Sequence, residues 1–340
     1  MRRSSFSGCA VLTVSAPNPF RIKPKLAQIN SFLYIIHFHY IYVANENEGV
    51  QGTNSEPQHF FPMNFHIYRP AANLHPYVKH YYYWHDDTTG VITLPQSLLS
   101  LGDQYMVFLQ EGEVSCQPCH HAAFQLPEAS VIGHFTCSSQ LKVKGPVKMV
   151  VVQLNAYGGH RLLGLNMHAI SNYFRNLAKT GNDSWEMLTA HLRTADAGQV
   201  PALLDQALQA AMQQQNYNKQ AVEKVADYLQ QQHGHVNIAH LANRFRLSRP
   251  TLERMFMEVV GLPPKLYASM LRFKKSMRVM QQIAMPQWQP LTGNGQYYNE
   301  AVLRQDYVYF NGQTPSFFMP SGTSGAVAQM PSTDAGVAVA

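Results

Sequence analysis

Residues 238–267 contain two short apolar runs at helical spacing, and this stretch limits the possible folds more than any other. Ser248 stands between the runs, where its hydroxyl can cap a second helix, and Pro250 falls in the first turn of that helix, where no N–H is needed. Small Ala242 lies where the first helix would cross the second, and apolar Leu252 follows ten positions later. This spacing predicts a helix-turn-helix.

The polar side of the second helix would face outward, and in a DNA-binding protein it enters the major groove. We expect DNA contacts from the residues at and after its start: Ser248, Arg249, Pro250, Thr251, Glu253 and Arg254. Arg249 would contact guanine or a phosphate, Glu253 would accept from cytosine N4, and Thr251 would contact a phosphate. The alternative is a helical hairpin with solvated surface charges, because this geometry also occurs in proteins that bind no DNA.

Basic residues are concentrated in the same part of the chain. Between Lys219 and Met280 there are eleven Lys and Arg against four Asp and Glu, a net formal charge of +7, compared with +6 for the whole chain. The remainder is therefore close to neutral. A positive domain beside a neutral one is typical of proteins that bind the phosphates of nucleic acid.

The same pattern recurs at an offset of 51 residues, which indicates a second helix-turn-helix unit. The matched pairs are Ser248 with Asn299, Leu252 with Leu303, Phe256 with Tyr307, Gly261 with Gly312, Pro264 with Pro315, and Tyr267 with Phe318. Between the units, residues 264–280 are expected to form one connecting helix. The start of the second unit is irregular, because Pro290, Gly293 and Gly295 are all unfavourable in a helix.

Residues 221–318 resemble the AraC/XylS family of bacterial transcription regulators. The shared motifs are LA at 241–242, S-x-x-x-L-x-R-x-F at 248–256, G-x-x-P at 261–264, Tyr267, Arg272–Phe273 and the terminal GQTPS. The resemblance implies two helix-turn-helix units, joined by a rigid helix, that enter successive major grooves on one face of the duplex. It also implies that Asn299 and Glu300 start the second reading helix and contact DNA.

The segments before Leu154 have the composition and length of β-strands and are separated by Gly, Pro and Asp. They are HYYYW, GVITLP, QYMVFLQ, AAFQLP, ASVIGHF, LKVKG and VKMVVVQL. They suggest an antiparallel barrel or sandwich, so the expected fold class is α+β. This part also resembles the sensing domain of one AraC-type subgroup, at Pro70, Leu74, Val78, Tyr81, Gly133 and Leu162–Gly164. The resemblance implies a pocket for a small-molecule effector whose identity the sequence does not give.

The pattern becomes helical after Asn166, in the segments HAISNYFRNLA, SWEMLTAHL and PALLDQALQAAM. The expected domains are a poorly ordered extension over 1–62, a β-rich sensing domain over 63–165, a helical connector over 166–217, a DNA-binding domain over 218–319 and a disordered tail over 320–340. The apolar run FLYIIHFHYIYV in the extension is too short and too often interrupted by His to span a bilayer.

Cys116, Cys119 and His120 have the C-x-x-C-H spacing of covalent haem attachment. A zinc site would instead use Cys116, Cys119 and a His such as His121, with a fourth ligand that the sequence does not place. The alternative is a pair of reduced cysteines on a turn, which fits a chain with few cysteines in a reducing compartment. We expect no catalytic residues, no metal and no cofactor, since neither a nucleophile elbow nor a phosphate loop is present.

The sequence thus predicts a cytoplasmic AraC-type transcription regulator that is not an enzyme and has no membrane partner. Its expected partners are promoter DNA and a small-molecule effector, with RNA polymerase and a second copy of the chain as further candidates. One alternative is an adaptor or decayed regulator that binds DNA weakly, because the second unit is eroded. The other is a haem or metal protein that uses the cluster at Cys116–His120.

Overall fold

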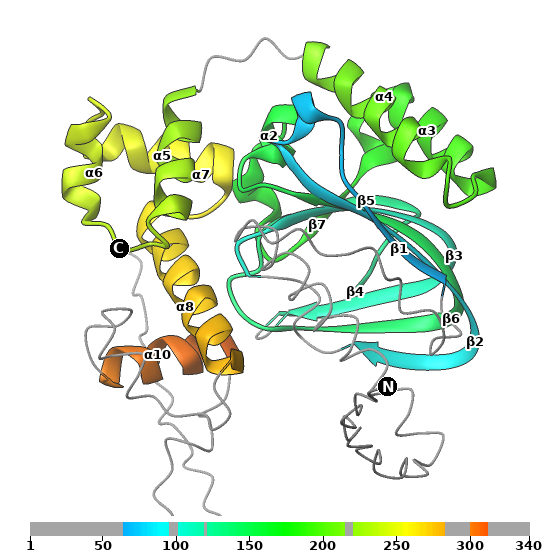
Figure 1. Cartoon of the computed structure of the whole chain (residues 1–340), viewed down its shortest axis with the longest axis horizontal. Coiled ribbons are helices and arrows are strands. Elements are labelled where there is room, and N and C mark those ends of the chain that lie inside the picture. The colour runs from blue at the N-terminus through cyan, green and yellow to red at the C-terminus, as the bar shows by residue number, and fades with distance from the viewer. Residues whose placement is uncertain (1–63, 95–100, 119–120, 215–219, 283–299, 312–340) are drawn as a thin grey trace, which may run out of the picture. The chain divides into compact units, whose positions relative to one another are not determined.

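The computed structural model describes residues 64–94, 101–118, 121–214, 220–282 and 300–311 (Figure 1). Within these ranges an antiparallel sheet precedes a series of helices, so the expected α+β fold class is confirmed. The predicted extension over 1–62 and the tail over 320–340 lie outside the described residues. No helix in the described ranges has the length and apolar character that a membrane crossing requires.

In the part of the chain that the structure describes, the sheet has seven strands and every pairing is antiparallel. The strands are β1 (Asn64–Tyr68), β2 (Val78–Leu94), β3 (Gln104–Pro118), β4 (Phe124–Gln125), β5 (Ala129–Ile132), β6 (Ser139–Leu154) and β7 (Phe174–Asn176). Their order is β1-β2-β6-β3-β5-β7, with β4 paired to β3. The two longest strands, β2 and β6, therefore lie side by side near the middle of the sheet.

Two pairs of expected strands are each continuous in the structure. HYYYW and the described part of GVITLP, up to Leu94, both belong to β2, and LKVKG and VKMVVVQL both belong to β6. The sequence DDTTG, expected as a break, is instead the place where the β2–β6 register shifts, between Asp86 and Gly90. A bulge lets a strand bend while its pairing continues on both sides. Gly90 has a φ of +131°, which few other residues adopt.

The α-helices are α2 (Gly158–Leu163), α3 (Asp183–Thr194), α4 (Val200–Gln214), α5 (Gln220–Gln231), α6 (Ile238–Arg244), α7 (Arg249–Val260), α8 (Pro264–Gln282) and α10 (Glu300–Asn311). Short 3-10 helices are η1 (Ala72–Leu74), η3 (Met167–Ile170) and η4 (Leu177–Thr180). The expected helices over SWEMLTAHL and PALLDQALQAAM correspond to α3 and α4, and the expected connecting helix corresponds to α8.

The prediction of a helix over HAISNYFRNLA is wrong. That segment forms η3, strand β7 and the start of η4. Asn166 and Asn176 each accept a hydrogen bond from the backbone N–H two residues later, and such local bonds compete with a continuous helix. Strand β7 then pairs with β5, a contact that local sequence does not encode.

The buried apolar residues form two clusters. In the first, α3 and α4 cover one face of the sheet, where Tyr81, Met106 and Phe108 are buried (Figure 1). The second gathers α5 to α8 and α10, and includes Ala156 and Tyr157 from just after β6. The helices of the expected connector therefore share a core with the sheet.

Candidate nucleic-acid interface

The helices α6 and α7 lie where the sequence predicts the two halves of a helix-turn-helix. The Asn237 side chain caps α6 by accepting from the N–H of Ala239 at 2.9 Å. The Ser248 hydroxyl caps α7 by accepting from the N–H of Thr251 at 3.3 Å, and Pro250 lies in the first turn. Arg246, in the turn between the helices, has a φ of +55°, a conformation more common for glycine.

Helix α7 has one buried side and one exposed side. Leu252, Phe256 and Val259 have no exposed surface, and Ala242 of α6 is buried beside them. Arg249, Pro250 and Arg254 are exposed, while Thr251 and Glu253 are partly exposed. The separation of core and surface residues thus follows the predicted helical periodicity.

Arg249 and Glu253 form an ion pair across one turn of α7, with 3.0 Å between Nε and Oε1. The two side chains are 70% and 47% exposed. A pair of this kind on a helix surface contributes about 0.3–0.5 kcal/mol, which is less than a good bidentate base contact at about 1–3 kcal/mol. Either group can therefore exchange its partner for a nucleic acid at small cost.

Helix α10 reproduces the position of α7 at the predicted offset. Its bounds, Glu300–Asn311, are those of α7 displaced by 51 residues. Leu303, the counterpart of Leu252, is fully buried, and Phe310 packs on Phe273 of α8 with 5.0 Å between ring centres. Asn299 and the first helix expected in this unit lie outside the described residues, so any role of Asn299 and Glu300 in contacting DNA stays a prediction.

The carboxyl end of α7 is attached to the sheet domain by side-chain hydrogen bonds. Gln104, the first residue of β3, donates to the carbonyl oxygens of Ala156 at 2.7 Å and Val260 at 3.3 Å. Ser171 donates to the carbonyl oxygen of Gly261 at 2.6 Å. Gly261 ends α7 with a φ of +94°, and a Cβ there would lie 2.8 Å from the carbonyl oxygen of Met167. Helix α7 is therefore anchored at its last turn.

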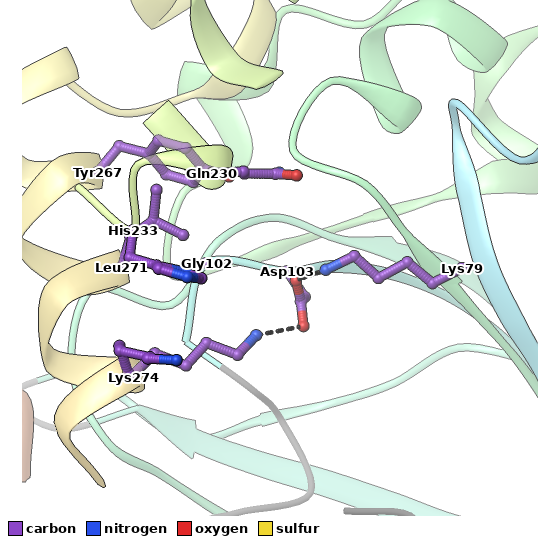
Figure 2. A pocket seen from close by; sticks show the side chains of 9 residues that line it. Lys79, Gly102, Asp103, Gln230, His233, Tyr267, Leu271 and Lys274 are labelled. Carbon is purple, nitrogen blue, oxygen red and sulfur yellow. Dashed lines mark hydrogen bonds and ion pairs between the residues drawn. The ribbon is translucent and has the colours of Figure 1, made fainter. Parts of the chain in front are cut away.

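A buried carboxylate, Asp103, connects the sheet to α8 (Figure 2). Its Oδ1 accepts from Lys79 of β2 at 2.5 Å, and its Oδ2 accepts from Lys274 of α8 at 2.9 Å. Gln153 of β6 also donates to Oδ2, at 2.8 Å. We call these four residues the Asp103 cluster. Burial alone would raise the pKa of Asp103, but the charges and hydrogen bonds of Lys274 and Lys79 outweigh it and hold that pKa below its ordinary value.

His134 and Tyr267 lie beside the same junction, with 5.9 Å between their rings. His134 is buried, and burial lowers its pKa to about 4, so the ring is neutral at physiological pH. On another part of the junction the Tyr157 hydroxyl donates to Asp227 of α5 at 2.9 Å. Polar side chains thus join the two cores at several points.

Sequence reasoning missed the Asp103 cluster. Local sequence indicates only a break before a strand at Asp103, and only one charge of a basic region at Lys274. The partners of Asp103 lie 24, 50 and 171 residues away in the chain. No local periodicity indicates such a pairing.

The proposed haem or metal cluster at Cys116 gains little support from the described part. Cys116 is buried in β3, and burial raises the pKa of its thiol to about 12, although a hydrogen bond with Ser139 opposes the shift. Thiolate is the form that binds metals, and it is scarce at such a pKa. His121 is exposed, while Cys119 and His120 lie outside the described residues. Among the described residues no three His, Cys, Asp or Glu side chains are grouped as metal ligands would be.

Comparisons with known proteins identify similarities in both parts of the chain. A family model described as a domain of unknown function (DUF6597) matches residues 66–175. No curated protein matches.

The crystal structure of ToxT from Vibrio cholerae O395 is 10% identical, with a TM-score of 0.36 over 77% of this chain and 99% of that one. ToxT from strain SCE256 with a bound unsaturated fatty acid is 8% identical, with a TM-score of 0.36 over 79% of this chain and 100% of that one. CuxR, described as an AraC-like transcriptional activator, is 9% identical, with a TM-score of 0.27 over 65% of this chain and 87% of that one. The chain is thus similar to a family of unassigned function in its sheet domain and, at low identity over most of its length, to solved structures that include an AraC-like activator.

Proposed function

We propose that this chain is a sequence-specific DNA-binding transcription regulator in which α7 reads bases in the major groove. In this proposal residues 63–165 form a sensing domain, 166–217 a helical connector, and 218–319 the DNA-binding domain. Promoter DNA is the partner and a small molecule is the effector. The chain regulates by presenting its reading helices and catalyses no reaction of its own.

The observation that carries the proposal is the division of α7 into an apolar buried side and an exposed, basic amino-terminal half. Arg249 and Pro250 are exposed in the first turn, directly after the Ser248 cap. In helix-turn-helix proteins these first residues of the second helix reach the base edges. A helix that served only as a structural element would not require an exposed arginine at that position.

Neighbouring residues supply further positive charge. Arg246, in the turn between the helices, and Arg254, on the exposed side of α7, both face solvent. Arg244 lies over the ring of Tyr228, with 4.4 Å between its guanidinium carbon and the ring centre. Such arginines can bind phosphates and hold the helix in register, while Arg249 and Glu253 supply base contacts.

The test is selection of the full-length protein against random duplexes, followed by binding titrations with Arg249→Ala and Glu253→Ala. We expect a motif of two boxes about 10–10.5 base pairs apart, with each substitution relaxing preference at positions in one box only. Arg175→Ala is a matched control, because Arg175 is an exposed arginine on the edge strand β7, outside the helix-turn-helix. It should leave the motif and the affinity unchanged.

Other outcomes would separate the alternatives. A single box would mean that α10 supports α7 without reading bases. Weak binding that is indifferent to sequence and vanishes with added salt would reduce the interaction to phosphate attraction and would favour an adaptor. In that case the proposed function would be rejected.

A further inference from the structure

A cavity of about 170 Å³ lies next to the Asp103 cluster (Figure 2). It is lined by residues of both cores: Lys79, Gly102, Asp103, Gln230, His233, Tyr267, Leu271, Lys274 and Lys275. Lys79 and the turn at Gly102 and Asp103 belong to the sheet domain. Gln230 and His233 come from the end of α5 and the turn after it, and the remaining lining residues belong to α8. A molecule bound here would therefore contact both the sheet and the connecting helix of the DNA-binding part.

The charges in this lining do not balance. Three lysines and one aspartate line the cavity, so these four side chains carry a net formal charge of +2. Lys79 and Lys274 are only 28% and 26% exposed, and both are bonded to the same carboxylate. Because partly buried charges are costly without counter-charge, the lining favours a second negative group in addition to Asp103.

Hydrogen-bond donors for such a group are available. An ammonium group has three N–H donors, and the one contact of the Lys274 ammonium in the described residues is with Asp103. Lys275, next in the chain and also on the cavity wall, has no ion-pair partner within the described ranges. The turn that places Asp103 here depends on Gly102, which has a φ of +80° and lies against the Tyr267 ring.

We propose that this cavity binds a small anion carrying two negative charges, of the phosphate or short dicarboxylate type. The volume limits the ligand, since sites for drug-sized molecules are about 300–1,000 Å³. Lys275 and the unused donors of Lys274 hold the anion, while Asp103 keeps Lys79 and Lys274 at the cavity wall. The bound anion strengthens the attachment of α8 to the sheet. Any effect of the anion on DNA affinity rests on the proposed function; binding itself does not.

The test measures thermal unfolding and calorimetric binding of the full-length protein with four probes: phosphate, sulfate, succinate and acetate. Sodium chloride keeps the ionic strength equal in every sample, because general screening also changes stability. We expect each dianion to raise the melting temperature and to bind with a stoichiometry of one. Acetate should bind more weakly and raise the melting temperature less. Comparing the affinity for phosphate and sulfate with the affinity for succinate distinguishes an inorganic oxyanion ligand from a dicarboxylate ligand.

Two substitutions on α8 make the test specific. Lys275→Gln should weaken dianion binding about tenfold, and it breaks no ion pair in the described structure. Lys265→Gln removes the same charge from the exposed start of the same helix, away from the cavity lining, and should leave binding unchanged. Equal weakening by both substitutions, or no binding by the wild type, would overturn the proposal.

A parallel titration separates this site from the proposed function. DNA affinity is measured with and without phosphate at equal ionic strength, in the wild type and in Lys275→Gln. A phosphate effect that is present in the wild type and lost in the variant supports regulation through the site. If the protein binds the anion through Lys275 but binds no DNA, the anion site is supported and the proposed function is rejected.

Discussion

Replacing Asp103 by asparagine removes the one negative charge between Lys79 and Lys274 and keeps the side-chain volume. The Asp103 side chain is 1% exposed, whereas the two lysines are about one quarter exposed. Removing one partner of a buried ion pair costs about 3–5 kcal/mol. Here the lysines can turn toward solvent, and asparagine still offers one acceptor oxygen. We therefore expect a loss near the lower end, about 3 kcal/mol of the free energy of unfolding.

The pH dependence of this loss follows from the lowered pKa of Asp103. The stabilisation is fully present above the pKa of an unfolded aspartate, about 3.9, and is lost as the pH falls below that value toward the folded pKa. The difference between the wild type and Asp103→Asn should therefore be constant from pH 7 to pH 5. It should shrink below about pH 4, where the wild type also loses the charge.

Denaturant titration at pH 7, 5 and 3.5 measures this difference. Asp183→Asn is the control, because Asp183 is an exposed aspartate in the first turn of α3 and its removal should cost less than about 1 kcal/mol. A loss below about 1 kcal/mol for Asp103→Asn at pH 7 would refute the reasoning. A difference that persists unchanged at pH 3.5 would assign the effect to packing and not to charge.

Two further predictions concern the same junction. His134 has a pKa of about 4 against an ordinary 6.5, so stability should be full above pH 6.5 and fall as the pH drops toward 4. His134→Gln should flatten that dependence in denaturant titrations at pH 7 and 5, and an unchanged slope would contradict it. Gly261→Ala should lose clearly more than about 1 kcal/mol, because the added Cβ meets the carbonyl of Met167 at 2.8 Å and the φ is +94°. Gly181 also has a positive φ, +73°, but a Cβ added there would have no atom within 4 Å. Gly181→Ala should therefore lose less stability in a thermal melt, and equal losses would mean that the contact with Met167 is unimportant.

The local features of α6, α7 and α10 could be predicted from sequence because they depend on residues close together in the chain. The cap at Ser248, the buried Leu252 and the bounds of α7 all follow from helical periodicity and capping within about a dozen residues. The offset of 51 likewise anticipates the position of α10. The fold class followed from the separation of strand-like and helix-like segments.

Features that depend on distant residues could not be predicted in this way. Strand β7 forms because β5 offers it a partner, and the helical composition of its sequence did not indicate this. The pairing across Asp86–Gly90 needs β6 to run beside β2 through a bulge. The Asp103 cluster depends on four segments that only the fold brings together: β2, the turn before β3, β6 and α8. From local sequence alone, an aspartate directly before a strand indicates a turn residue, which is its more common role there.

The most direct test of the central claim is the affinity of the full-length protein for its selected duplex compared with a scrambled duplex at physiological salt. We predict a preference of at least about 10³-fold, which is typical of sequence-specific DNA-binding proteins. Arg249→Ala should reduce this preference about tenfold or more, because one bidentate base contact is lost. A wild-type preference close to one would contradict the claim that α7 reads DNA.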